Sequence, residues 1–98
     1  FLEEVYHEAL EIELTTRQIP FVSRAALPLL YKSSVMSKSY QADLIVGGDI
    51  IIELKAVRSL VAEHEAQLIN YLKATRKRVG YLINFGSFPK LDWKRLVL

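Results

Sequence analysis

A glycine-containing turn between two runs of apolar residues constrains this chain most. The apolar runs at residues 44–46 and 50–52 flank Gly47-Gly48-Asp49, a combination that is typical of a β-hairpin with buried strands. A three-residue loop at this turn sets a register in which Asp43 lies opposite Glu53. The sequence therefore predicts two acidic side chains that face each other across neighbouring strands.

Two facing carboxylates need a positive partner. Like charges directly opposite in a sheet are destabilising because their Cβ atoms are only about 4.5–5.5 Å apart. A divalent cation between Asp43 and Glu53 would remove that repulsion. Lys55 follows Glu53 by two residues, on the same side of the strand and about 7 Å further along. This pattern favours a hydrolytic site, whereas the alternative reading is a cross-strand cluster of surface ion pairs.

Composition narrows the kind of protein and of metal. A chain of 98 residues that is 51% apolar is expected to form a single domain over residues 1–98. The absence of cysteine excludes disulfides, zinc-thiolate sites and a thiol nucleophile, and it leaves oxygen ligands that suit Mg²⁺ or Mn²⁺. The net charge of +2 is too small to identify a nucleic-acid partner by itself.

The ends of the chain and its hydropathy bear on location. No apolar run approaches the roughly 18 residues that a membrane span needs, and no signal peptide precedes the first helix. We therefore expect a cytoplasmic protein without a membrane partner. The chain starts inside a helical pattern at Phe1 and Leu2 without a capping residue, so we expect further residues at the natural N-terminus.

Apolar spacing predicts two helices in an α/β fold. The predicted helices span residues 2–17 and 62–77. The predicted strands lie at residues 21–23, 27–32, 43–46, 50–55, 79–85 and 91–97. A polar turn at residues 33–37 joins the first strands into an antiparallel meander. Residues 50–52 do not alternate with polar residues, which predicts a central strand covered by a helix on each face.

The second predicted helix carries a polar stripe that starts at His64. Gln67 and Tyr71 follow at spacings of three and four, so the three side chains share one face and point toward the end of the Lys55 strand. Gln67 is then a candidate to hold the lysine or a substrate phosphate. The alternative is that Tyr71 belongs to the core and the other two are polar surface residues.

The first helix offers two candidates for a third acid. Glu3 lies near Leu10 and Leu14 in angular projection, away from the glutamates that face solvent. Glu13 falls closer to the middle of the apolar stripe, and is either the inward-pointing carboxylate or the partner of a buried arginine. We prefer Glu3, and the choice between the two stays open at this point.

Basic residues and one tryptophan lie outside this pattern. Lys73, Arg76, Lys77 and Arg78 end the second helix, where cations ordinarily complement the helix dipole. Lys90, Lys94 and Arg95 lie near the last predicted strand. We take them as weak support for binding to nucleic acid. Trp93 is interpreted as a core or interface residue rather than a base-stacking platform.

The order of these motifs resembles the PD-(D/E)XK nuclease superfamily, with an Asp in one strand, Glu-x-Lys in the next and a helix bearing Gln and Tyr. More narrowly, it resembles the small bacterial GxxExxR proteins. The segments that carry this narrower likeness are residues 2–6, 42–44, 52–57, 64–72 and 82–86. Ala42 stands at the superfamily's nominal proline position.

The resemblance implies a restriction-endonuclease-like mixed β-sheet flanked by helices, and an Mg²⁺-dependent phosphodiesterase site. It assigns Asp43, Glu53, Glu3 and the backbone carbonyl of Leu54 as metal ligands. Lys55 would position water or offset charge, and Gln67 would be a supporting polar group.

The leading functional hypothesis is a metal-dependent nuclease that acts on nucleic acid, with DNA as the expected substrate. A rival from another class is a catalytically inactive module of the same fold that binds nucleic acid or a protein partner. A sugar- or nucleotide-processing metalloenzyme ranks last, because no glycine-rich phosphate loop or Ser-His pair is present. We also expect a homodimer, with Leu96-Val97-Leu98 at its edge.

Overall fold

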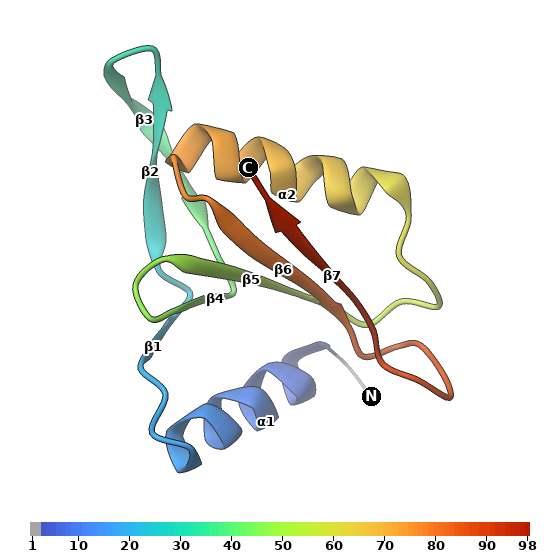
Figure 1. Ribbon diagram of the computed structural model, residues 1–98. Helices are drawn as coiled ribbons and strands as arrows, with labels where there is room; N and C mark the ends of the chain where they lie inside the picture. Colours follow the sequence, from blue (N-terminus) through green and yellow to red (C-terminus); the bar gives the residue numbers. More distant parts are fainter. Residues whose placement is uncertain (1–2) are drawn as a thin grey trace.

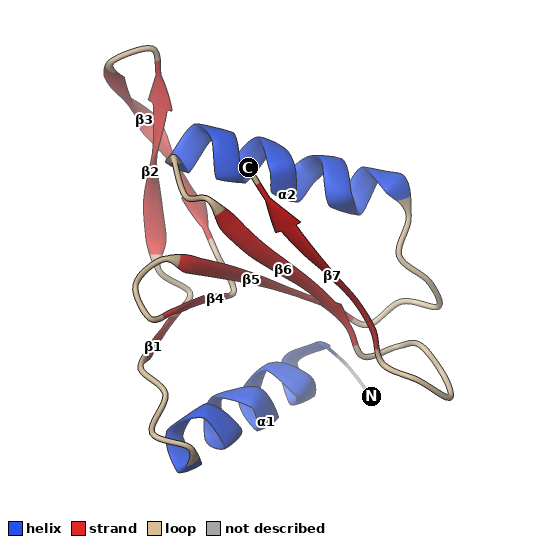
Figure 2. Ribbon diagram, in the orientation of Figure 1, coloured by secondary structure: helices blue, strands red, loops and turns tan. Residues whose placement is uncertain are grey.

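The computed structural model describes residues 3–98 as an α/β fold with two sheets (Figures 1 and 2). Along the chain, the elements are α1 (Glu3–Thr16), β1 (Phe21–Ser23), β2 (Ala26–Tyr31), β3 (Ser34–Gln41), β4 (Leu44–Val46), β5 (Ile50–Lys55), α2 (Ala62–Thr75), β6 (Val79–Asn84) and β7 (Asp92–Val97). No helix among these residues is long and apolar enough to cross a membrane.

The main sheet has five strands in the order β1-β4-β5-β6-β7. Its strands are antiparallel except for β5 and β6, which run parallel and are joined through α2. The predicted mixed sheet with flanking helices is thus confirmed. Because β5 lies in the middle, its residues have neighbouring strands on both sides, as the uninterrupted apolar run at residues 50–52 predicted.

Each face of the sheet packs against one helix (Figure 1). On the α2 face, Ile51 packs in a buried cluster with Leu68 and Leu72 of the helix. On the α1 face, Ile52 and Leu54 cluster with Leu14 of α1. Alternate residues of β5 therefore enter opposite cores, and this fixes the register, because a slip of one residue would exchange the two faces.

The observed hairpin register matches the predicted register in every pair except the last one. Val46 lies opposite Ile50, as the three-residue loop requires. The ladder ends at Leu44 and Ile52, so the prediction that Asp43 and Glu53 are ladder partners is wrong. The side chain of Asp43 occupies the place of the next ladder bond, since its Oδ2 accepts from the Leu54 amide at 2.8 Å.

The predicted meander at the start of the sheet is also wrong. Strands β2 and β3 pair only with each other in a separate two-stranded sheet, here called the ribbon, which projects away from the main sheet (Figure 2). Residues 34–37, predicted as a turn, belong to β3. Their Ser-rich sequence looked like a loop because nearly all of β3 is exposed and buries no apolar face.

The ribbon continues the β1–β4 pair through a bend. The Arg24 amide donates to the Asp43 carbonyl at 2.9 Å, and the Ala42 amide donates to the Ala25 carbonyl at 3.2 Å. Pairing therefore runs unbroken from Ser23 opposite Leu44 in the main sheet to the ribbon. Arg24 adopts a left-handed backbone with φ 52°, so the chain changes direction there. Asp43 consequently lies at the bend.

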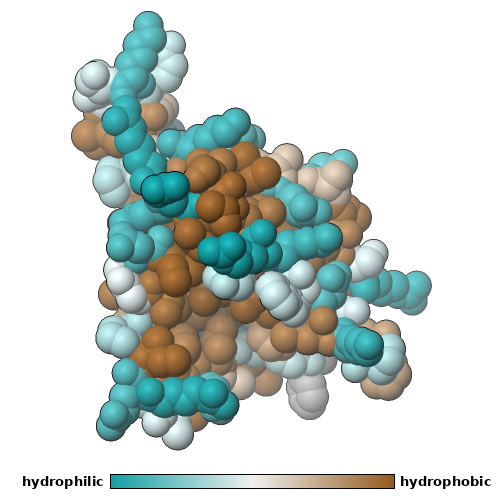
Figure 3. All heavy atoms as spheres, viewed as in Figure 1, coloured by the Kyte–Doolittle hydropathy of each residue, from teal (hydrophilic) through white to brown (hydrophobic). Residues whose placement is uncertain are grey.

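Hydrophobic side chains remain visible on part of the surface. In Figure 3 they show through the middle of the face, between the regions of the two helices, while hydrophilic residues reach the tip of the ribbon. Trp93 and Val97 of β7 are 54% and 51% exposed. Trp93, on the edge strand β7, is therefore not a core residue, and the other half of its interpretation, an interface residue, stays a prediction.

Candidate active site

The predicted acids and lysine come together at one end of β5. Asp43 at the bend and Glu53 on β5 are both partly buried. The Asp43 amide donates to Glu53 Oε1 at 3.4 Å, while the Asp43 carboxylate accepts from the Leu54 amide. Each acid is thus held by the backbone of the other strand, which keeps the two side chains near each other without a ladder bond.

Glu3 belongs to the same electrostatic group. Burial raises the pKa of Glu3, the nearby Asp43 raises it further, and Lys55 lowers it. These effects require Glu3, at the start of α1, to lie near the end of β5. Glu13 is elsewhere, because it forms an exposed ion pair with Arg17 at 2.5 Å. Of the two acids weighed for the first helix, Glu3 is the one in electrostatic range of Asp43, and its role in the site stays a prediction.

Two contacts fix the position of Glu3 by holding α1 against β1. The buried His7 shares a hydrogen bond of 2.7 Å with Ser23 Oγ. One turn earlier, Glu4 pairs with Arg24 at 2.5 Å. The ion pair is exposed and contributes little by itself, whereas the buried hydrogen bond is costly to break. Together they direct the first turn of α1 toward the bend at Asp43.

Within the site, the pKa of Glu53 departs most from its ordinary value. Burial raises its pKa to about 7, Asp43's backbone N–H and the Lys55 ammonium lower it, and Glu3 raises it. A carboxylate that desolvation holds near neutral pKa is a frequent mark of a functional site. Lys55 lowers the pKa of both Glu3 and Glu53, so its ammonium lies within electrostatic range of both acids.

The backbone of Leu54 faces Asp43. Successive residues of a strand direct their N–H and C=O groups to alternate sides. The Lys55 carbonyl accepts from the Phe85 amide at 2.8 Å, on the β6 side. The Leu54 amide binds Asp43 on the opposite side, and the Leu54 carbonyl shares that direction. The role of this carbonyl as a metal ligand stays a prediction.

Gln67 reaches the acids only through two tyrosines. Its Nε2 donates to the Tyr71 hydroxyl at 3.4 Å. The Tyr71 ring stacks on Tyr40 with centroids 3.7 Å apart, and the Tyr40 hydroxyl donates to Glu53 Oε1. Among residues 3–98, Gln67 makes no hydrogen bond to Lys55, and its support of the site stays a prediction. The third member of the predicted stripe, His64, instead accepts from the Val61 amide at the start of α2.

Sequence reasoning missed Tyr40. This residue is only 6% exposed and lies at the base of the ribbon, in a strand whose other residues are exposed. The signal in the sequence was a single aromatic residue three positions before Asp43, which is too weak to separate it from an ordinary core residue. Only the fold shows that it contacts Glu53.

The donor set of this site suits a hard cation. Asp43, Glu53, Glu3 and the Leu54 carbonyl offer only oxygen ligands, which Mg²⁺ and Mn²⁺ prefer. In the described part of the chain, no three His, Asp or Glu side chains lie together as a ready metal cluster. Mg²⁺ needs only one or two carboxylates and keeps several waters, so the residues fit such an ion with Asp43 and Glu53 as its first ligands.

Comparison with known proteins decides the family. The family model described as the PD-(D/E)XK nuclease superfamily matches residues 1–96. The chain belongs to the PD-(D/E)XK nuclease superfamily. Among curated proteins, no sequence matches it.

A solved structure agrees with the fold of this superfamily member. The crystal structure of SSO0001 superposes with a TM-score of 0.72 at 21% sequence identity, over 96% of this chain and 50% of that one. The chain therefore spans about half the length of this structural relative. At this identity the likeness establishes a shared fold, and the family match carries the nuclease-like character.

Proposed function

We propose that this PD-(D/E)XK chain is a Mg²⁺- or Mn²⁺-dependent nuclease that hydrolyses phosphodiester bonds of nucleic acid, with DNA as its substrate. The observation that carries the proposal is the gathering of Glu3, Asp43, Glu53 and Lys55 from α1, the bend and β5. Two acids held beside each other, with a third acid and a lysine in electrostatic range of them, suit a metal ion and a phosphate better than an ordinary surface ion-pair cluster.

Each residue has a distinct role in this proposal. Asp43 and Glu53 would hold the ion, with Glu3 and the Leu54 carbonyl completing its surroundings. A bound Mg²⁺ would polarise the phosphate and lower the pKa of water. Lys55 would orient the attacking water or offset the negative charge that develops on the phosphate. The new bond joins water oxygen to phosphorus, and the bond from phosphorus to the leaving sugar oxygen breaks.

Hydrogen bonds from neighbouring groups hold the two carboxylates in place before a metal binds. The Leu54 amide fixes one oxygen of Asp43, and the Tyr40 hydroxyl holds Glu53. In residues 3–98, neither Asp43 Oδ1 nor Glu53 Oε2 has an assigned protein donor, which leaves one oxygen of each acid for an ion. Carboxylates held by such outer partners need little reorganisation when they bind a metal.

Calorimetry followed by cleavage tests this proposal. Mg²⁺ and Mn²⁺ are titrated into the wild type, Asp43→Asn and Glu53→Gln, with Glu13→Gln as an acid-removing control. The same proteins are then incubated with linear, circular and single-stranded DNA and with RNA. We expect Asp43→Asn and Glu53→Gln to lose both metal binding and cleavage, and Glu13→Gln to keep both. Wild-type protein that binds no metal would refute the proposal.

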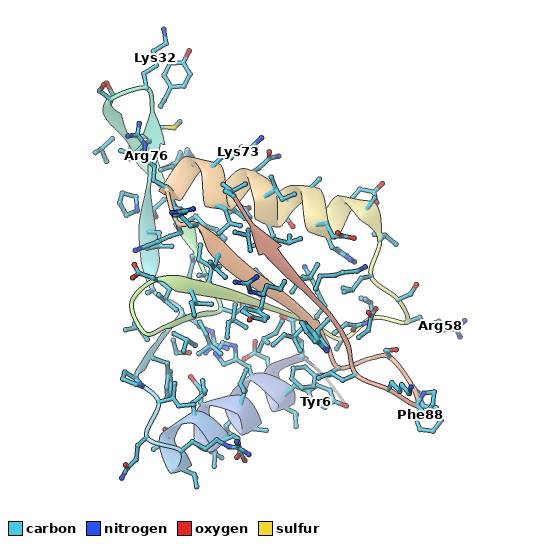
Figure 4. All side chains as sticks on the ribbon, viewed as in Figure 1. Tyr6, Lys32, Arg58, Lys73, Arg76 and Phe88 are labelled. Carbon is cyan, nitrogen blue, oxygen red and sulfur yellow. The ribbon has the colours of Figure 1, made fainter. Side chains whose placement is uncertain are left out.

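A second candidate is a catalytically inactive module of the same fold that binds nucleic acid. It is favoured by the absence of a ready three-ligand metal cluster in residues 3–98 and by cations near the ribbon. Figure 4 shows Lys32 at the ribbon tip, with Arg76 and Lys73 nearby, and Arg76 donates to the Lys32 carbonyl at 2.6 Å. Binding that is salt-sensitive but unaffected by metal would support this candidate.

We also propose the finer placement within the GxxExxR group and a homodimer. The edge strand β7 carries the exposed Trp93 and Val97, which suits pairing with a second copy. Sedimentation equilibrium tests the dimer. Val97→Lys should yield monomers, because a charge on an edge strand opposes strand pairing.

A further inference from the structure

Two loops meet at the carboxyl ends of the parallel strands β5 and β6. Asn84, which is fully buried, joins them. Its Nδ2 donates to the Val57 carbonyl at 2.8 Å, and its Oδ1 accepts from the amides of Val57 and Gly86 at 2.9 and 3.0 Å. Residues 56–61 and 85–91 are therefore held side by side, directly after the strand that carries Lys55.

Phe88, in the second of these loops, is 93% exposed, more than any other large hydrophobic residue in the described part of the chain. Figure 4 shows it at the outer end of the loop, projecting away from the sheet. The neighbouring Phe85 behaves differently, since its ring stacks on Tyr6 with centroids 4.7 Å apart. One aromatic ring thus anchors the loop while the other is presented to solvent.

Basic residues lie in the same two loops as the Phe88 ring. Arg58 and Lys90 are exposed members of the two loops, and residues 54–62 and 85–91 contain no acid. Figure 4 shows Arg58 and Phe88 projecting from the same side of the molecule. Arg58 follows Lys55 by three residues, so their Cα atoms are at most about 11 Å apart. The aromatic and basic surface therefore borders the end of β5.

We propose that Phe88, Arg58 and Lys90 form a platform that binds single-stranded nucleic acid, with Phe88 stacking on an unpaired base and the two cations contacting the backbone. The inference rests on the proposed function, whose substrate class it narrows. Exposed aromatic rings beside basic residues bind single strands in this way because every unpaired base offers a π-face. In a duplex, these faces are already stacked on neighbouring bases. The absence of acids in both loops suits a polyanion.

Fluorescence anisotropy with labelled oligothymidylate and a matched duplex tests the platform. EDTA is present, so binding is measured apart from metal and cleavage. We expect tighter binding of the single strand, and a roughly tenfold loss in Phe88→Ala. Phe88→Trp should retain the affinity. Tyr31→Ala is the matched control, because it removes another exposed aromatic ring, 65% exposed, from the ribbon.

The contribution of the cations to the platform is measured separately, through the salt dependence of binding. Arg58→Ala should reduce the slope of log affinity against log salt concentration by about 0.7, the value for one phosphate contact on a single strand. Unchanged oligothymidylate binding in Phe88→Ala, or an equal loss in Tyr31→Ala, would overturn the platform. A chain that cuts duplex DNA but ignores single strands would overturn the platform alone. Phe88-dependent binding without metal-dependent cleavage would overturn only the proposed hydrolysis.

Discussion

The Tyr40 hydroxyl donates a hydrogen bond to the Glu53 carboxylate, so a residue of the ribbon contacts an acid of the main sheet. The Tyr40 ring is held in turn by Tyr71 of α2. Glu53 is therefore oriented by a side chain that lies outside its own sheet.

Tyr40→Phe should weaken Mg²⁺ and Mn²⁺ binding about tenfold, because it removes an outer partner of a ligating carboxylate. The ring and its stack on Tyr71 are kept, so the fold should persist with a loss of about 1–3 kcal/mol from the missing hydrogen bond. Tyr71→Phe is the control, since its hydroxyl contacts Gln67 rather than an acid. Calorimetric affinity in Tyr40→Phe equal to that of the wild type would contradict this role.

Stability should fall as pH rises toward neutrality. Burial raises the pKa of Glu53 from 4.5 to about 7 in the folded chain, so between these values the folded state holds a proton that the unfolded chain has lost. The free energy of unfolding then decreases from about pH 4.5 to pH 7, by roughly 3 kcal/mol, and levels off above.

Urea denaturation of the metal-free protein at several pH values measures this decline. Glu53→Gln should show a flatter profile and greater stability at pH 8 than the wild type. Added Mg²⁺ should stabilise the wild type most above pH 7, where Glu53 is ionised and able to bind it. A wild-type profile as flat as that of Glu53→Gln would show that Glu53 titrates normally.

Glu3→Gln should weaken metal binding, whereas Glu13→Gln should not. Both substitutions remove one charge from α1, but only Glu3 is electrostatically coupled to Asp43 and Lys55. The Glu13 ion pair with Arg17 is exposed, and its loss should be nearly neutral. Parallel calorimetric titrations compare the two variants, and equal effects would remove Glu3 from the site.

Gly86→Ala should destabilise the fold by about 1–3 kcal/mol. A Cβ atom at Gly86 would clash with the Val57 carbonyl oxygen and would lie 2.5 Å from the Val57 nitrogen, so the loop after β5 must move. Chemical denaturation measures the loss. Ser87→Ala, at the next position, should leave the unfolding midpoint within error of the wild type, and a Gly86→Ala midpoint that matched it would contradict the clash.

Local patterns were sufficient to predict the hairpin. The turn at Gly47 and Gly48, with φ of 63° and 83°, matches what its glycines favoured, and β5 alternates between two cores as its apolar run required. The second helix ends at Thr75, two residues before its predicted end. There, Arg76 adopts the left-handed backbone conformation of a C-cap. An arginine at this position does not predict that conformation.

Longer-range features were beyond sequence patterns. The contact between Tyr40 and Glu53 depends on the bend at Arg24, which no glycine or proline marks. Asn84 was read only as a strand residue, although it joins two loops. Whether Glu3 or Glu13 faces the other acids depends on how α1 rotates against the sheet, and the contact between His7 and Ser23 that orients this helix is a tertiary one.

The ribbon has a dynamic consequence. Its two strands pair only with each other, and β3 is exposed along most of its length, so the ribbon should open locally at a lower free energy than the five-stranded sheet. Opening that starts in this exposed part and extends to the buried Tyr40 would withdraw the Tyr40 hydroxyl while β5 stays folded. The orientation of Glu53 would then follow the opening equilibrium of the ribbon, and amide hydrogen exchange in β3 would report how often this acid is released.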